Sequence, residues 1–142
     1  MKLVPSYPSA SKLIESTARG TVGRDQLKRT PAIFYRTEAG SEPVRSWLRA
    51  MDSQDRRLVG EDIKTVEFGW PVGMPTCRPM GDGLHEVRTH LPGNRIVRVF
   101  FYIDRKQRMV LLHGLVKKSQ ATPASDLDLA RQNMRKHEKG LK

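Results

Sequence analysis

The sequence contains few of the residues on which disulfide, zinc and membrane structures depend. There is one cysteine, Cys77, in 142 residues, which excludes an internal disulfide and a zinc site built from cysteines. The mean hydropathy is −0.57, and no stretch approaches the roughly 20 apolar residues that a membrane helix needs. The first residues also lack the apolar core of a secretory signal. We therefore expect a cytoplasmic protein with no membrane association.

The common catalytic motifs are also missing. The patterns G-x-x-x-x-G-K-[ST], G-x-G-x-x-G, H-E-x-x-H and G-x-S-x-G do not occur. A metal site needs three or four convergent ligands, and only His85, Glu86 and His90 lie close together in the sequence. On a strand, residues 85 and 86 would point to opposite faces. We expect neither a metal ion nor a cofactor.

Acidic residues are scarce compared with basic ones. Lysine and arginine total 26, aspartate and glutamate total 15, and the net charge is +11. This charge favours a polyanionic partner, which could be nucleic acid, an acidic protein or an anionic membrane surface. The alternative is a basic protein that has no such partner.

Composition divides the chain into two parts. Residues 1–32 are rich in proline, glycine and serine and hold six lysines or arginines against two acidic residues. We interpret them as a basic flexible N-terminal arm; a start codon assigned too far upstream is the alternative. Residues 33–142 are long enough for one folded domain with its own core.

Hydrophobic spacing in residues 33–142 switches between the periods of strands and helices. Strands are predicted at 33–36, 84–90, 95–103 and 109–116, and amphipathic helices at 43–51, 53–70 and from 122 onward. Residues 69–79 contain three prolines and are predicted to be a loop. Residues 135–142 are expected to be a frayed basic tail. Strands that cluster beside separate helices indicate an α+β fold.

The two strands at 95–103 and 109–116 form the most apolar part of the chain and are predicted to be a hairpin. Val97 and Val99 would face the core, so Arg98 between them would face the other way. A long cation within an apolar strand suggests a phosphate ligand. An internal ion pair with Glu86 is the structural alternative.

Further cations belong to this part of the predicted sheet. Arg88 should face away from Val87, and the last strand ends in two lysines that point opposite ways. The candidate set is Arg88, Arg98, Lys117 and Lys118. A solvated sheet face is the ordinary explanation for charged strand residues, but here the opposite face is apolar, so the positive charge would be concentrated on one side.

Several segments resemble a known family. They are F-Y-R-T-E-A-G, P-V-R-S-W-L, E-D-I-K-T-V-E-F-G-W-P-V-G-M-P, G-D-G-L-H-E-V-R-T-H-L, R-V-F-F and L-L-H-G-L-V-K-K-S-Q-A-T-P. Together they resemble the phage-derived, HigB-like branch of the RelE/ParE toxin superfamily, from Phe34 to about Lys136. The resemblance implies a RelE-like antiparallel β-sheet with two N-terminal helices packed on it and a C-terminal helix.

The resemblance also implies a function. It points to the toxin of a type II toxin–antitoxin pair that cleaves messenger RNA, commonly on the ribosome, without a metal, and that a helix-turn-helix, HigA-like antitoxin neutralises. Carried over by position, Arg88, Arg98 and Lys117 or Lys118 would be catalytic and, with His90, would bind RNA. For the general base the resemblance offers His137 in the expected tail, or His90 or His113.

Two other functions remain open at this point. ParE-like members share the fold but poison DNA gyrase, and the fold alone does not separate the two activities. A non-enzymatic module that binds nucleic acid or protein would also fit the charge.

Overall fold

The computed structural model describes residues 29–117 and 122–141. In chain order the elements are β1 (Ala32–Phe34), α2 (Pro43–Arg49), α3 (Ser53–Gly69), β2 (Cys77–Gly81), β3 (Leu84–Leu91), β4 (Arg95–Ile103), β5 (Met109–Lys117) and α4 (Ala124–Gly140). The strands form one sheet in the order β1-β5-β4-β3-β2. Neighbouring strands are antiparallel except β1 and β5, which are parallel. The predicted α+β class, with two helices before the main strands and one after them, is confirmed.

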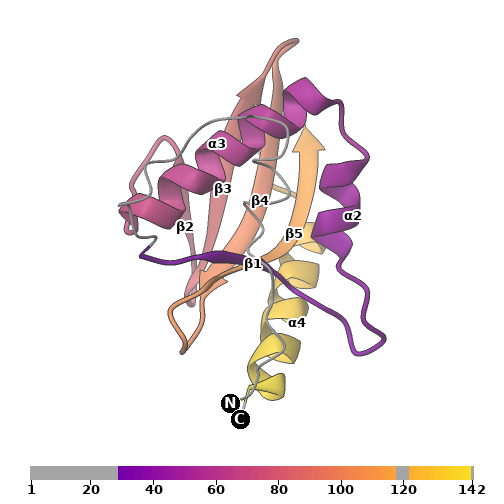
Figure 1. Ribbon diagram of the computed structural model, residues 1–142, viewed down its shortest axis with the longest axis vertical. Coiled ribbons are helices and arrows are strands. Elements are labelled where there is room, and N and C mark those ends of the chain that lie inside the picture. Colours follow the sequence, from indigo (N-terminus) through magenta and orange to yellow (C-terminus); the bar gives the residue numbers. More distant parts are fainter. Residues whose placement is uncertain (1–28, 118–121, 142) are drawn as a thin grey trace.

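The helices lie on both faces of the sheet. Figure 1 shows α2 and α3 in front of the strands and α4, in yellow, behind them. Within the residues that the structure describes, no helix is both long enough and apolar enough to cross a membrane.

The first core lies between the sheet and the pair α2 and α3. Pro43 occupies the first turn of α2, where its missing N–H costs no helical hydrogen bond. Apolar residues then recur every three or four positions along both helices, as the sequence predicts. Full burial of one such aliphatic side chain contributes about 1.5–3 kcal/mol. The buried members are Ala32, Phe34, Val44, Leu48, Val59, Ile63, Val66, Cys77, Val87, Leu91, Val97, Val99, Phe101, Met109 and Leu111.

A smaller core lies under α4 on the opposite face. Its buried members are Ile33, Tyr35, Leu84, Phe100, Tyr102, Val110, Leu112 and Ala130. The buried amide of Asn133 donates a hydrogen bond of 3.0 Å to the backbone carbonyl of Leu112. This bond attaches the middle of α4 to β5.

The start of the described chain is part of this fold. The backbone N–H groups of Arg29 and Thr30 both donate to the carbonyl of Glu67 at the end of α3. The N–H of Ala32 donates to the Glu67 carboxylate at 2.6 Å. Residues 29–32 of the predicted arm are thus packed on α3, and residues 1–28 lie outside the described part of the chain.

The prediction of a loop through residue 79 was wrong. Cys77–Gly81 is a fifth strand, β2, which pairs with β3 at the edge of the sheet. A proline cannot donate to a strand ladder, but an edge strand has one side with no neighbour, so Pro79 is tolerated there. The register shifts between Pro79 and Gly81. This strand places Arg78 directly across from Glu86.

The prediction of a frayed C-terminal tail was also wrong. Helix α4 continues to Gly140, and the side chain of His137 is buried, with Nε2 3.0 Å from the Asp104 carboxylate. The hydroxyl of Tyr102 donates to Glu138 at 2.7 Å. Burial alone would raise the pKa of Asp104, but hydrogen bonds from Arg108 and His137 bring it below its usual value. These polar contacts hold the last two turns of α4 against the end of β4.

Strand β5 passes close to α2 at Gly114. A Cβ atom added there would lie 2.6 Å from Cη2 and 2.8 Å from Cε3 of Trp47. Such distances are well inside van der Waals contact, so the indole ring already occupies the space that any side chain at position 114 would need. The small residue is therefore required by the packing of Trp47.

Replacing Gly114 with alanine should lower the free energy of unfolding by about 1–3 kcal/mol, the usual cost of overpacking a core. The measurement is urea denaturation at equilibrium. Gly73→Ala is the control, because nothing lies within 4 Å of a Cβ at that position. Adding Trp47→Leu to Gly114→Ala should recover part of the loss. Equal midpoints for the two alanine variants would contradict this account of the packing.

Candidate functional site

The candidate site lies on the face of the sheet that carries α4. Across antiparallel strands, directly paired residues point to the same face. Arg88 pairs with Arg98, and Arg78 pairs with Glu86. Val87 and Val99, on the opposite face, belong to the core under α3. Three neighbouring strands, β2, β3 and β4, therefore bring three arginines and one glutamate together.

Glu86 is the centre of this cluster. Its carboxylate oxygen Oε2 lies 2.9 Å from Nη1 of Arg98, 3.8 Å from Nε of Arg88 and 3.9 Å from Nη1 of Arg78. The glutamate side chain has no exposed surface. Its other oxygen, Oε1, has no hydrogen-bond partner in the described part of the chain. Three guanidinium groups around one carboxylate leave a local excess of positive charge.

The three arginines differ in exposure. The side chain of Arg98 is fully buried, that of Arg88 is 11% exposed and that of Arg78 is 43% exposed. The ion pair with Glu86 that the sequence allowed for Arg98 is present, and a second contact runs from Nη1 to Oγ1 of Thr122 at 3.5 Å. Arg98 thus has a structural role, while Arg88 and Arg78 extend from this buried pair toward solvent.

The lysines at the end of β5 were part of the predicted site. Lys117 pairs with Ile96, which has the same strand parity as Arg98, so Lys117 lies on the α4 face. It is half-buried. Lys118 lies outside the described residues.

The histidines occupy four different environments. His90 is exposed on β3, two positions after Arg88 and therefore on the same face. His113 on β5 has Nε2 2.7 Å from the carboxylate of Asp126 in the first turn of α4. His85 lies on the opposite face between Trp70 and Phe101, where burial lowers its pKa. His137 is bound to Asp104 at the far end of α4.

The single cysteine does not contribute a nucleophile here. Cys77 is buried in the core under α3. Burial, and secondly the negative charge of Glu86, raise the pKa of its thiol to about 11. At neutral pH it is therefore protonated and unreactive.

Sequence reasoning missed Arg78 and the full role of Glu86. Arg78 was missed because its strand was predicted to be a loop. Glu86 was considered as a possible metal ligand and as the partner of Arg98, but not as the common partner of all three arginines. The alternation of residues 84–90 contained the signal for Glu86, because it places residues 86 and 88 on one face.

The fold defines a class of protein. An α+β domain with two helices on one face of its sheet and one C-terminal helix on the other is consistent with the RelE-like fold. The chain belongs to the family described as Phage derived protein Gp49-like (DUF891), which matches residues 46–135, more than half of the chain. This family is related to the toxins of toxin–antitoxin systems. No curated protein matched the chain.

Proposed function

We propose that this chain is the toxin of a type II toxin–antitoxin pair, of the HigB-like branch of the RelE/ParE superfamily, and that it cleaves messenger RNA as a metal-independent endoribonuclease. The observation that carries the proposal is the cluster of Arg78, Arg88 and Arg98 around the buried Glu86. Membership of a toxin-related family supports it.

The chemistry of RNA suits such a cluster. RNA carries its own nucleophile, so the protein needs no serine or cysteine. The 2′-oxygen attacks the adjacent phosphorus, the bond to the 5′-oxygen breaks, and the products are a 2′,3′-cyclic phosphate and a free 5′-hydroxyl. One proton leaves the 2′-hydroxyl and one reaches the 5′-oxygen. Negative charge grows on the phosphate during this step, and fixed cations stabilise it.

In this proposal Arg88 contacts the scissile phosphate. Its guanidinium is nearly buried yet reaches the surface, and Glu86 limits its rotation. A planar guanidinium can bind two phosphate oxygens at once and remains charged at all relevant pH values. The buried Arg98 positions Arg88 indirectly, because both arginines contact Glu86. Lys117 and Lys118 extend the positive surface at the end of β5. His90 binds the RNA strand beside them.

We propose His113 as the group that transfers the protons. Its Nε2 is bonded to Asp126, which would fix the orientation of the ring. His137 is buried against Asp104 and is less suited. We propose that the ribosome aligns the message, since positioning can replace much of the activation that a strong base would supply.

The proposed partner is a helix-turn-helix, HigA-like antitoxin with an acidic surface that covers Arg88 and Arg98. Positive potential around the cluster would speed the association with such a surface. Masking the cluster would stop RNA cleavage without unfolding the toxin.

Induced expression in a bacterial host, followed by mapping of new RNA 5′ ends, tests the proposed activity. We expect discrete cuts within translated reading frames. A gyrase supercoiling assay with the purified chain runs in parallel. If the RNA stays intact and cleaved DNA is trapped on gyrase, the chain is a gyrase poison and not a nuclease. If neither effect is seen, the chain is a non-enzymatic binding protein. Cells that express the Arg88→Ala variant are the matched control for cleavage.

A further inference from the structure

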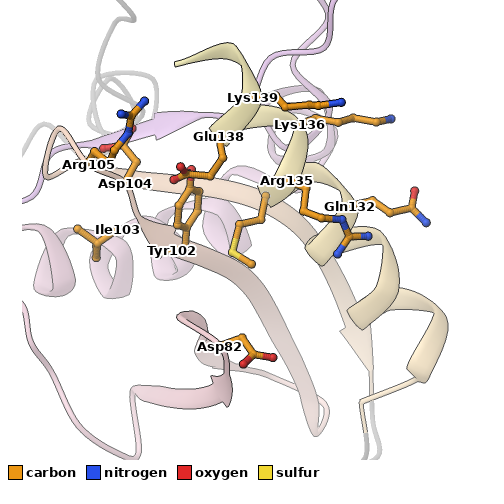
Figure 2. A pocket seen from close by; sticks show the side chains of 11 residues that line it. Asp82, Tyr102, Ile103, Asp104, Arg105, Gln132, Arg135, Lys136, Glu138 and Lys139 are labelled. Carbon is orange, nitrogen blue, oxygen red and sulfur yellow. The ribbon is translucent and has the colours of Figure 1, made fainter. Parts of the chain in front are cut away.

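A second recognition surface lies at the other end of α4, away from the arginine cluster. It is a groove of about 900 Å³ between the C-terminal half of α4, the end of β4 and the turn that contains Asp82. Figure 2 shows its lining residues. Tyr102 is four positions along β4 from Arg98, which corresponds to about 13 Å at the usual rise of a strand. The groove is therefore separate from the proposed site of RNA cleavage.

The floor of this groove is largely apolar. It is formed by the side chain of Met134 and the edge of the Tyr102 ring, which is 6% exposed. Ile103 borders the groove, but its side chain packs on the opposite face, against the core under α3. Met134 is only partly buried and packs on the core under α4. A bulky apolar side chain from another molecule could cover these groups and be removed from water, which is favourable in proportion to the apolar area buried.

The acidic residues of the groove are already paired with neighbours. The Asp104 carboxylate is bonded to Arg108 at 2.8 Å and to His137 at 3.0 Å. Glu138 accepts the hydroxyl of Tyr102, and Asp82 lies 3.7 Å from Arg131. The negative charges of Asp104 and Asp82 are therefore partly offset by neighbouring arginines, whereas Glu138 is bonded to a neutral hydroxyl.

Four cations line the groove, and they are not paired in this way. Figure 2 shows Arg105 near the end of β4 and three cations on α4, where the side chains of Lys136 and Lys139 extend away from Tyr102. The four are Arg105, Arg135, Lys136 and Lys139. They are exposed, and none makes an ion pair or side-chain hydrogen bond with any other residue that the structure describes. Elsewhere on the surface, Arg36, Arg57 and Arg95 each pair with a carboxylate.

We propose that this groove binds an acidic segment of a partner protein, with a bulky apolar side chain on its floor and carboxylates against the four cations. An apolar anchor flanked by complementary charge is a common way for proteins to recognise short segments. The proposal does not depend on the nuclease activity, because it uses none of the residues assigned to cleavage.

Two other occupants fit the groove less well. Single-stranded RNA is usually held by exposed aromatic faces between cations, but the one aromatic ring here, Tyr102, is only 6% exposed and its hydroxyl is bonded. Residues 1–32 of the chain itself hold six basic and two acidic residues. The rim of the groove would repel such a segment.

The test uses a fluorescent acidic peptide made of glutamates with leucines at helical spacing, titrated with the full chain and followed by anisotropy. Reversing two rim charges, Lys136→Glu with Lys139→Glu, should weaken binding by about tenfold or more, which is 1.4 kcal/mol. The matched control is Arg49→Glu with Arg57→Glu, two exposed residues of α2 and α3 on the opposite face of the sheet. It changes the net charge equally and should weaken binding less than about twofold.

Two further measurements keep the result decisive. Arg105 lies outside α4, and Arg105→Glu should also weaken peptide binding. Such a loss could not be explained by a disturbance of α4. The same peptide with serine at every leucine position should bind about tenfold more weakly. Equal losses in the two double variants would mean general charge attraction and would overturn the proposal. The proposal would also be overturned if binding of a single-stranded RNA oligonucleotide required Lys136 and Lys139 while binding of the acidic peptide did not. The groove would then be assigned to nucleic acid.

Discussion

Replacing Glu86 with alanine should lower the free energy of unfolding by about 3–5 kcal/mol, the typical cost of breaking a buried ion pair. Glu86 and Arg98 are both fully buried, with 2.9 Å between their charged atoms. Removing the carboxylate leaves the Arg98 guanidinium in a low-dielectric interior beside two other arginines. Urea denaturation measures the effect.

The control for this prediction is Glu61→Ala. Glu61 forms an exposed pair with Arg57 at 3.5 Å on α3, and exposed pairs contribute only about 0–1 kcal/mol. The double variant Glu86→Leu with Arg98→Met should regain much of the stability, because replacing both partners of a buried pair by apolar groups is often neutral. A Glu86→Ala variant as stable as Glu61→Ala would show that the arginines do not need this carboxylate.

Replacing Arg88 with alanine should lower the rate of messenger RNA cleavage by about 100- to 1000-fold with little change in stability. This is the usual effect of removing one fixed donor from a developing negative charge, about 2.7–4 kcal/mol of barrier. The prediction follows from the place of Arg88, which lies beside Glu86 with 11% of its side chain exposed, and it rests on the proposed function. The measurement is single-turnover cleavage of a message in a purified translation reaction.

Lysine variants separate charge from geometry. Arg88→Lys keeps the charge but loses the planar fork, so it should recover only part of the rate. Arg98→Lys should lower the rate by about tenfold or more, equal to 1.4 kcal/mol, and must be accompanied by an unfolding curve because Arg98 is buried. Arg57→Ala on the opposite face should cleave normally. A folded Arg88→Ala variant with full activity would remove Arg88 from the site.

The sequence by itself determined the features that depend on neighbouring residues. The spacing of apolar residues in α2 and α3 predicted both helices and the faces that they bury. The alternation around Arg98 and Arg88 predicted which side of the sheet carries the charge, because successive strand residues must point to opposite faces.

Only the tertiary structure decided how distant segments meet. Strand β2 forms because it pairs with β3 at the edge of the sheet, where Pro79 is tolerated. The local sequence of this segment, with its prolines, indicated a loop. The last turns of α4 are helical because His137 and Glu138 bond to Asp104 and Tyr102, more than 30 positions earlier in the chain. Such contacts stabilise a segment from outside it, so no pattern within the segment reveals them.

The candidate site shows the same division. The residues on β3 and β4 could be proposed from their own strands. The order and register of three strands decide how many arginines surround Glu86. They also decide that Arg98 is buried while Arg88 reaches solvent. Register is set by packing over the whole sheet, because a slip of one residue would turn every side chain to the opposite face.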